Sequence, residues 1–301
     1  MRGSQKPSLG STLQGLGAVL LWGALATLTA LSGSVPPFQL AAMTFAIGTC
    51  AGFAYTFATG QDLRELATVP WGAWALGVSG LLGFHACYFL ALRKAPALEA
   101  SLIVYLWPLL LVLFSGLLPS GDEGRGLRWW HVVGALFGFA GTILILLGAS
   151  GRPEFAGSTL GYTLALCAAV IWAAYSVASR AFARVPSTAV IGSCAATALG
   201  ALLLHLALED AVWPASATQW LAVLGLGLGP VGLAFYLWDA GMKHGNLRLL
   251  GVASYATPLA SMVLLVGSGL SQGSSGIWLA SLLITGGALL AAKDQIFRRS
   301  A

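Results

Sequence analysis

Charged residues are scarce in this chain, and their scarcity excludes an ordinary soluble protein. They make up 8% of the 301 residues, whereas apolar residues make up 57% and the mean hydropathy is +0.84. A soluble domain has about 25% charged residues. Since a soluble fold could not bury so much apolar surface, we expect the partner of this surface to be a lipid bilayer. The basic residues are scattered singly between apolar runs, which predicts no binding of nucleic acid.

Cysteines are few, and the motifs of membrane-embedded enzymes are missing from the sequence. There is no HExxH, no paired carboxylate and no Gly-x-Ser-x-Gly elbow. The histidines fall in separate apolar segments, at His85, His131, His205 and His244. The cysteines have neither metal-ligand spacing nor the spacing of a secreted disulfide framework, at Cys50, Cys87, Cys167 and Cys194. We therefore predict a protein without metal, cofactor or enzymatic activity.

What the sequence does contain is a series of ten apolar segments. Each has about 20 residues, the length that a helix needs to cross ~30 Å of hydrocarbon. Short connections rich in proline, glycine and charge separate them. The expected spans are Ser11–Leu31, Pro36–Thr59, Trp71–Leu92, Ala97–Leu118, His131–Gly148, Leu160–Phe182, Ser187–Leu208, Trp220–Ala240, Leu247–Gly267 and Gly276–Lys293. The fold class predicted is an all-α integral membrane protein with ten transmembrane helices.

The two halves of the chain resemble each other at a separation of 150 residues. This offset relates Trp22 to Trp172, Pro36 to Pro186, Tyr105 to Tyr255 and Pro108 to Pro258. We therefore expect two repeats, residues 1–150 and residues 151–301, with five spans each. An odd number of spans requires that the second repeat enters the membrane from the opposite side. The prediction is two inverted five-helix repeats around a central cavity, an arrangement typical of transporters that alternate between two open sides.

The distribution of basic residues predicts the orientation. Twelve of the 15 would lie on the side of the two termini, and the other three are Arg93, Lys94 and Arg152. Basic residues are more frequent in cytoplasmic segments. We therefore expect both termini in the cytoplasm and a location in a bacterial inner membrane.

Polar and aromatic side chains within the spans are the candidates for a binding site. Seven tryptophans, such as Trp71 and Trp130, lie at span ends, where rings commonly sit at headgroup level, while four lie inside spans, Trp22, Trp107, Trp172 and Trp238. Polar residues at helical spacing form strips that should face a cavity rather than lipid, although helix packing is the alternative for each one. The predicted substrate-binding residues are His85, Tyr88, Tyr105, Trp107, Trp172, Tyr175, Ser254 and Tyr255.

Two prolines and several glycines are predicted to shape the helices. Pro108 and Pro258 each remove a hydrogen bond in the middle of a span and are expected to act as hinges, with a fixed bend as the alternative. Without these bonds, the carbonyls of Val104 and Ser254 should lose their usual donors. Glycines spaced by four predict close helix contacts, at Gly48 and Gly52, Gly134 and Gly138, and Gly225 and Gly229.

The lack of charge within the spans indicates the substrate. A path for phosphorylated anions would need a basic residue, and proton exchange would need a carboxylate, but none lies in mid-span. We expect Asp239 to pair with Lys243, and Glu99 with Arg93 or Lys94. His205 should be a packing residue. With His85 as the one ionisable group deep in the path, the substrate should be neutral overall with an apolar ring or side chain, and transport should be facilitated.

These segments also resemble a known family. The stretches "AVLLWGA" and "AVIWAAY" around Trp22 and Trp172, with "YLWP" and "YATP", resemble the EamA branch of the drug/metabolite transporter superfamily. Residues 84–108, "FHACYFLALRKAPALEASLIVYLWP", resemble bacterial aromatic amino-acid exporters of that branch. The resemblance implies a basket-like ten-helix exporter of aromatic and other neutral amino acids, with a cavity lined by His85, Tyr88, Tyr105, Trp107 and Trp172.

One departure from the family concerns the second span. Many relatives carry a basic residue where this chain has Met43-Thr44-Phe45, which further disfavours an anionic substrate. We expect a monomer. The alternatives are an exporter of another neutral metabolite or drug in the same superfamily, a passive channel, or a membrane-embedded enzyme.

Overall fold

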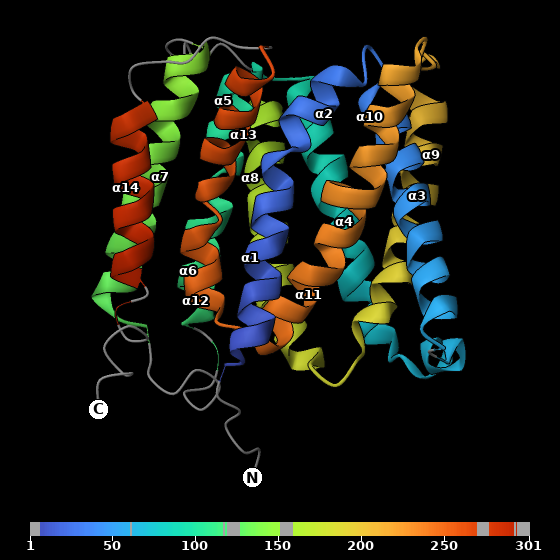
Figure 1. Cartoon of the computed structure of the whole chain (residues 1–301), viewed down its shortest axis with the longest axis horizontal. Helices are drawn as coiled ribbons and strands as arrows, with labels where there is room; N and C mark the ends of the chain where they lie inside the picture. Colours follow the sequence, from blue (N-terminus) through green and yellow to red (C-terminus); the bar gives the residue numbers. More distant parts are fainter. Residues whose placement is uncertain are drawn as a thin grey trace.

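The computed structural model describes residues 7–60, 62–116, 118, 127–150, 159–269, 277–291 and 293. Throughout these residues it is helical and contains no strand, as predicted, and the helices run side by side along one common direction (Figure 1). The first half contains α1 (Leu9–Gly23), α2 (Leu25–Leu31), α3 (Pro37–Ala58), η1 (Leu63–Thr68), α4 (Trp71–Leu92), α5 (Ala97–Val104), α6 (Trp107–Ser115) and α7 (Trp129–Ser150).

The second half is helical as well. It contains α8 (Thr159–Ala178), η2 (Ser179–Phe182), η3 (Ser187–Ala189), α9 (Val190–Leu208), α10 (Ala217–Leu228), the π-helical turn η4 (Gly229–Leu233), α11 (Ala234–His244), α12 (Leu247–Ala253), α13 (Ala256–Gly267) and α14 (Ile277–Ala291).

Seven helical stretches within the described residues are long and apolar enough to cross a membrane. They are Leu9–Leu31, Pro37–Ala58, Trp71–Leu92, Thr159–Phe182, Ser187–Leu208, Ala217–His244 and Leu247–Leu264. Three shorter apolar helices accompany them, Glu99–Ser115, Trp129–Leu144 and Leu282–Ala291. The chain is therefore a multi-pass membrane protein.

The outer surface of the bundle is apolar in the middle and carries tryptophans at helix ends. Leu206 and Leu282, on outward faces of α9 and α14, are 70% and 71% exposed, which suits contact with lipid. Trp71 begins α4 and Trp129 begins α7, and both are strongly exposed. These two positions agree with the predicted tryptophans at span ends.

Glycines allow neighbouring helices to approach closely. A Cβ atom added to Gly134 in α7 would lie 2.6 Å from the carbonyl oxygen of Gly287 in α14. One added to Gly48 in α3 would lie 3.0 Å from the Cα atom of Gly232 in η4. Close contacts are confirmed for Gly48, Gly52, Gly134 and Gly138, but the prediction was wrong for Gly225 and Gly229, whose nearest neighbours are leucine side-chain atoms at 3.5 Å and 3.9 Å.

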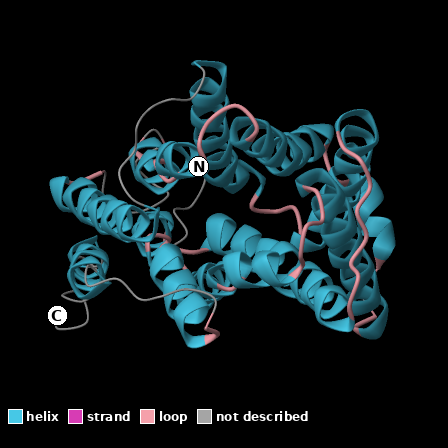
Figure 2. Ribbon diagram, turned by 90° about the horizontal axis from the view of Figure 1, so that it is seen from above, coloured by secondary structure: helices cyan, strands magenta, loops and turns pink. Residues whose placement is uncertain are grey.

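The central helices come from both halves of the chain. Helix α4 packs along α8, and α1 packs along α11, so that each pair joins one half to the other. Helix α6 also packs against α8, and α13 against α1. The view from above looks along the bundle and shows many of the helices end-on, with loops joining them at the near end (Figure 2). The facing side chains of the central helices form the main buried cluster and position the site described next.

Candidate functional site

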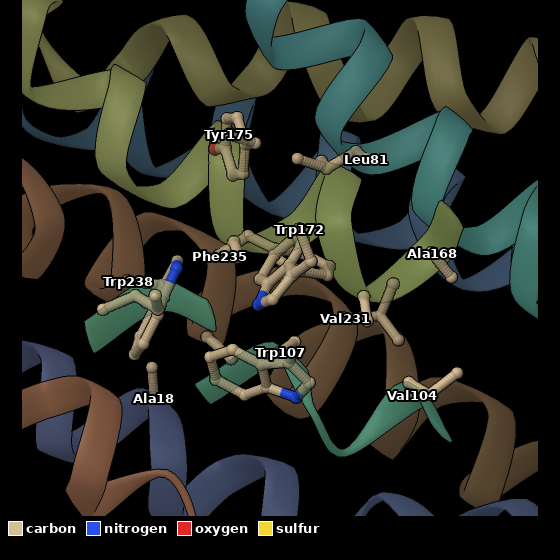
Figure 3. Packing of buried hydrophobic residues seen from close by; sticks show 14 of the residues in the cluster. Ala18, Leu81, Val104, Trp107, Ala168, Trp172, Tyr175, Val231, Phe235 and Trp238 are labelled. Carbon is tan, nitrogen blue, oxygen red and sulfur yellow. The ribbon is translucent and has the colours of Figure 1, made fainter. Parts of the chain in front are cut away.

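The four tryptophans inside the spans meet at the centre of the bundle. Trp22 belongs to α1, Trp107 to α6, Trp172 to α8 and Trp238 to α11. Every pair of these rings is in contact, with centroid distances between 5.0 and 6.4 Å. Figure 3 shows three of them, Trp107, Trp172 and Trp238, around one another. We call these four residues the tryptophan cluster.

The indole N–H groups of the tryptophan cluster fall into two classes. Trp22 donates from Nε1 to the carbonyl oxygen of Pro230 at 3.0 Å, and Trp238 donates to the hydroxyl of Ser176 at 3.1 Å. Among the described residues, no group accepts a hydrogen bond from the indoles of Trp107 and Trp172. Because an indole nitrogen can only donate, these two N–H groups are the ones available to a ligand.

His85 lies beside the tryptophan cluster within a shell of aromatic rings. Its Nδ1 atom is 2.7 Å from the carbonyl oxygen of Leu81. A carbonyl can only accept, so Nδ1 carries the hydrogen, and in the neutral ring Nε2 is an acceptor. The side chain is only partly buried. Its ring neighbours are Phe45 at 4.9 Å, Phe84 at 5.1 Å, Phe89 at 5.8 Å and Phe235 at 6.1 Å.

Hydroxyl groups on α4 and α5 extend this region. The Tyr88 hydroxyl lies 3.4 Å from the Ser101 hydroxyl, and the Tyr88 ring stacks on Phe84 at 5.9 Å. Tyr105 follows the last residue of α5. Tyr88, Ser101 and Tyr105 are all partly exposed, although their helices are central ones. Aromatic rings, hydroxyls and one imidazole therefore come together here, in agreement with the predicted strips.

Tyr175 lies next to the tryptophan cluster but is packed more tightly. Its ring is 5.3 Å from Trp172 and would clash with a Cβ atom on Gly80, 2.4 Å away. It also lines a small cavity together with Asp239 and Lys243. Tyr175 of α8 is therefore packed against α4, next to the tryptophan cluster.

The structure does not bring Ser254 and Tyr255 to this region. Tyr255 is fully buried in a second cluster, where its ring lies against Gly138 of α7 and 6.2 Å from Phe139. The Ser254 hydroxyl is fully buried and donates to the Leu250 carbonyl at 2.7 Å. The prediction that both bind substrate followed from helical spacing and from the match to the first half, whereas the Ser254 hydroxyl bonds one turn back and the Tyr255 ring packs against α7. We leave them out of the candidate site.

The two predicted hinge prolines follow breaks in their helices. One break separates α5 from α6 just before Pro108, and the other separates α12 from α13 just before Pro258. The Ser254 carbonyl is not left without a donor, because it accepts from the Thr257 N–H at 3.1 Å. The usual donor is absent, as expected, because Pro258 has no N–H, and the chain tightens locally so that a donor three residues ahead takes its place.

A third irregular element was missed. At Gly229–Leu233 the chain forms a π-helical turn that contains Pro230, and the Pro230 carbonyl receives the Trp22 indole. Such turns free backbone groups and are common at functional sites. The sequence signal was a mid-span Gly-Pro between further glycines. The ring neighbours Phe45, Phe84 and Phe235 were also missed, because a phenylalanine inside an apolar span does not differ in pattern from one that faces lipid.

The charged residues with predicted partners lie outside the tryptophan cluster, and each of Asp239, Lys243, Arg93 and Glu99 has a polar partner. Lys243 Nζ is 2.7 Å from Asp239 Oδ2, which confirms that predicted pair. Arg93 donates to the carbonyl of Leu208, whereas the Glu99 carboxylate accepts from the Tyr162 hydroxyl. The predicted partner Arg93 therefore has a different role.

His205 is a structural residue, as expected. Its Nδ1 lies 3.1 Å from the carboxylate of Glu209, which accepts from the backbone N–H groups of Phe38 and Gln39. These N–H groups open α3, and a carboxylate is stabilising at a helix N-terminus. His205 therefore positions the Glu209 carboxylate, which links the end of α9 to the start of α3.

The two ends of the bundle differ in packing. On the side at which α1 begins, here called the N-terminal side, α6 packs against α12 and α11 packs against η2 (lower part of Figure 1). The offset of 150 residues makes α5 with α13, and α4 with α2, the equivalent pairs on the opposite side. Neither of these pairs makes a comparable contact in the described part of the chain. The central helices are therefore closed together on the N-terminal side.

Comparisons with known proteins agree with this arrangement. The model of the EamA-like transporter family matches the chain twice, over residues 10–147 and 159–292. The aromatic amino acid exporter YddG of Ancylobacter novellus is 51% identical over 282 residues, with 93% of this chain and 96% of that protein covered. The exporter of the same name from Salmonella typhimurium is 29% identical over 291 residues, with the same coverage. A solved crystal structure, 50% identical, superposes with a TM-score of 0.87 and covers 94% of this chain and 97% of its own.

Proposed function

The chain belongs to the EamA-like transporter family, and from this premise we propose that it exports aromatic and other neutral amino acids. As a member of the family it is a transporter and not an enzyme. The observation that carries the proposed substrate class is the aromatic region at the centre of the bundle. The tryptophan cluster and the rings around His85 offer flat apolar faces, and in the part of the chain that the structure describes no cation lies among them to bind a phosphate.

The polar groups of the region suit the two ends of a zwitterionic amino acid. The unpaired indole N–H groups of Trp107 and Trp172 can donate to a carboxylate. Nε2 of His85 and the hydroxyl of Tyr88 can accept from an ammonium group. The side chain of the substrate would then lie against Phe84 and Phe89, where ring pairs gain about 0.5–1.5 kcal/mol beyond the buried area.

We further propose ten spans in two inverted repeats around a central cavity. The three shorter apolar helices would complete the seven longer ones. The double match of the family model supports one unit in residues 1–150 and another in 151–301. The packing of helices supports a twofold relation between the repeats, because the pair α4 and α8 has its equivalent in α11 and α1. Both termini would be cytoplasmic in a bacterial inner membrane, and the carrier would act as a monomer.

This arrangement supports alternating access. The structure is closed on the N-terminal side, which would be the cytoplasmic side, and so corresponds to the state open to the outside. Pro108, Pro258 and the π-helical turn lie between the closed and the open parts of their helices and would serve as hinges. Tyr105 would line the open path, and Tyr175 would belong to the closed wall beneath it.

The test is transport by the purified protein in liposomes. Labelled phenylalanine or tryptophan should enter, and an excess of unlabelled external substrate should accelerate the release of labelled substrate. A passive channel would show no such acceleration. His85→Phe keeps the ring packing but removes both polar nitrogens, and should lower the apparent affinity for phenylalanine by about tenfold. Trp130→Ala, on a span end, is the control that should leave substrate selection unchanged. Failure of every neutral amino acid to be transported would contradict the proposal.

A further inference from the structure

Lys243 closes the N-terminal side of the bundle. This residue, near the end of α11, donates from Nζ to the carbonyl oxygen of Val185 at 2.9 Å. It also pairs with Asp239, which accepts a hydrogen bond from Ser187 at 2.7 Å. Lys243 and Asp239 are both buried. These contacts tie the end of α11 to the connection between η2 and η3, so they would have to break before this side could open.

The opposite side carries the same parts at the equivalent positions. Val185-Pro186 has its equivalent in Val35-Pro36, and Lys243 has its equivalent in Arg93, each 150 residues earlier. Pro36 and Pro186 share one backbone conformation, with φ and ψ of −59° and 148° in the first and −63° and 149° in the second. The two valine carbonyls are therefore presented by equivalent turns.

In this structure the basic residue donates to the valine carbonyl on the N-terminal side only. No hydrogen bond reaches the Val35 carbonyl within the described residues. Arg93 instead donates twice to the carbonyl of Leu208, the last residue of α9, at 3.0 and 3.1 Å. Arg93 is exposed there. An exposed hydrogen bond of this kind contributes little, because water replaces it when it breaks.

We propose that Arg93 is the latch of the opposite state, in which its guanidinium donates to the Val35 carbonyl as Lys243 donates to Val185 here. The proposal rests on the alternating-access mechanism of the proposed function. When the N-terminal side opens, Lys243 leaves Val185, the end of α4 approaches the connection between α2 and α3, and Arg93 exchanges Leu208 for Val35. Each half thus contributes one basic residue that closes one side.

The two latches are unequal. The position equivalent to Asp239 is Phe89, so the carboxylate that fixes Lys243 has no counterpart beside Arg93. Lys243 therefore has a buried carboxylate and a carbonyl as partners, whereas Arg93 would have the carbonyl without the carboxylate. The substrate-free carrier should for this reason rest with its N-terminal side closed, as in this structure.

The test measures the accessibility of the N-terminal side without substrate. Cys50, Cys87, Cys167 and Cys194 are replaced by alanine, and Ser179→Cys serves as the reporter, because Ser179 is buried in the closed wall. A membrane-impermeant maleimide is applied from the N-terminal side to vesicles that contain the full chain. Arg93→Met should lower the labelling rate by about fivefold, since the bond to Val35 that it removes from the open state contributes more than the exposed bond to Leu208 that it removes from the closed state. Lys243→Met should raise the rate by about as much.

Three further variants serve as controls. Arg93→Lys retains an ammonium donor, as Lys243 provides in the other half, and should be labelled at the parental rate. Arg64→Met removes a cation that belongs to neither latch and should also be labelled at the parental rate. Asp239→Asn/Lys243→Met avoids leaving Asp239 unpaired and should also label faster. If Arg93→Met labels at the parental rate or faster, the bond to Leu208 is the one that matters and the proposal is wrong. An error in the substrate class would appear in liposome transport and leave these labelling rates unchanged.

Discussion

The two classes of indole in the tryptophan cluster predict opposite consequences for one substitution. Trp238 donates to Ser176, which is fully buried, whereas the Trp172 indole has no acceptor among the described residues. Replacement by phenylalanine keeps a ring at either position and removes the N–H. Both variants lose some packing, about 1 kcal/mol, because the smaller ring leaves a small cavity. Trp238→Phe additionally leaves the Ser176 hydroxyl without its donor, which costs about 1–3 kcal/mol.

The measurement separates stability from transport. In thermal unfolding of the detergent-solubilised protein, Trp238→Phe should have a clearly lower midpoint than Trp172→Phe. In liposomes the order should reverse: Trp172→Phe should lose about tenfold in apparent affinity for phenylalanine, the value of a hydrogen bond to a charged carboxylate. Trp22→Phe and Trp107→Phe form a second matched pair, with Trp22 bonded to Pro230 and Trp107 unbonded. Equal midpoints within both pairs, with unchanged transport by Trp107→Phe and Trp172→Phe, would refute this assignment.

Three other predictions follow from the charges. Lys243→Met should lower the unfolding midpoint because it leaves Asp239 buried and unpaired, a loss of about 3–5 kcal/mol, and Asp239→Asn/Lys243→Met should recover most of it; a double variant as unstable as the single one would argue against the pair. A reporter active only in the cytoplasm, fused after Ala301, should be active, and periplasmic activity would reverse the orientation. A pH gradient alone should not drive concentrative uptake of phenylalanine, since Asp239, the carboxylate that follows Trp238, is paired with Lys243; if it does, His85 is the first residue to replace.

Much of the candidate site could be predicted because polar groups inside an apolar span avoid lipid and therefore face a cavity or other polar groups. His85, Tyr88 and Tyr105 come together as the strips predicted, and Trp107 and Trp172 lie beside them. Ser254 could not be placed in the same way. Its hydroxyl can bond to the carbonyl one turn back, which satisfies it inside its own helix. Helical spacing defines a face but does not say which neighbour that face meets.

The sequence by itself determined the solvent, the helical class and the family, because each depends on composition or on motifs along the chain. A run of 20 apolar residues can satisfy its backbone in lipid only as a helix, whatever its neighbours are. The tertiary structure decided which side chains meet. The four tryptophans come from helices far apart in sequence, and only packing sets their distances of 5.0–6.4 Å. It also decided which side is closed. Both halves carry a basic residue and a valine carbonyl that could bond, and in this structure only Lys243 donates to its carbonyl, that of Val185.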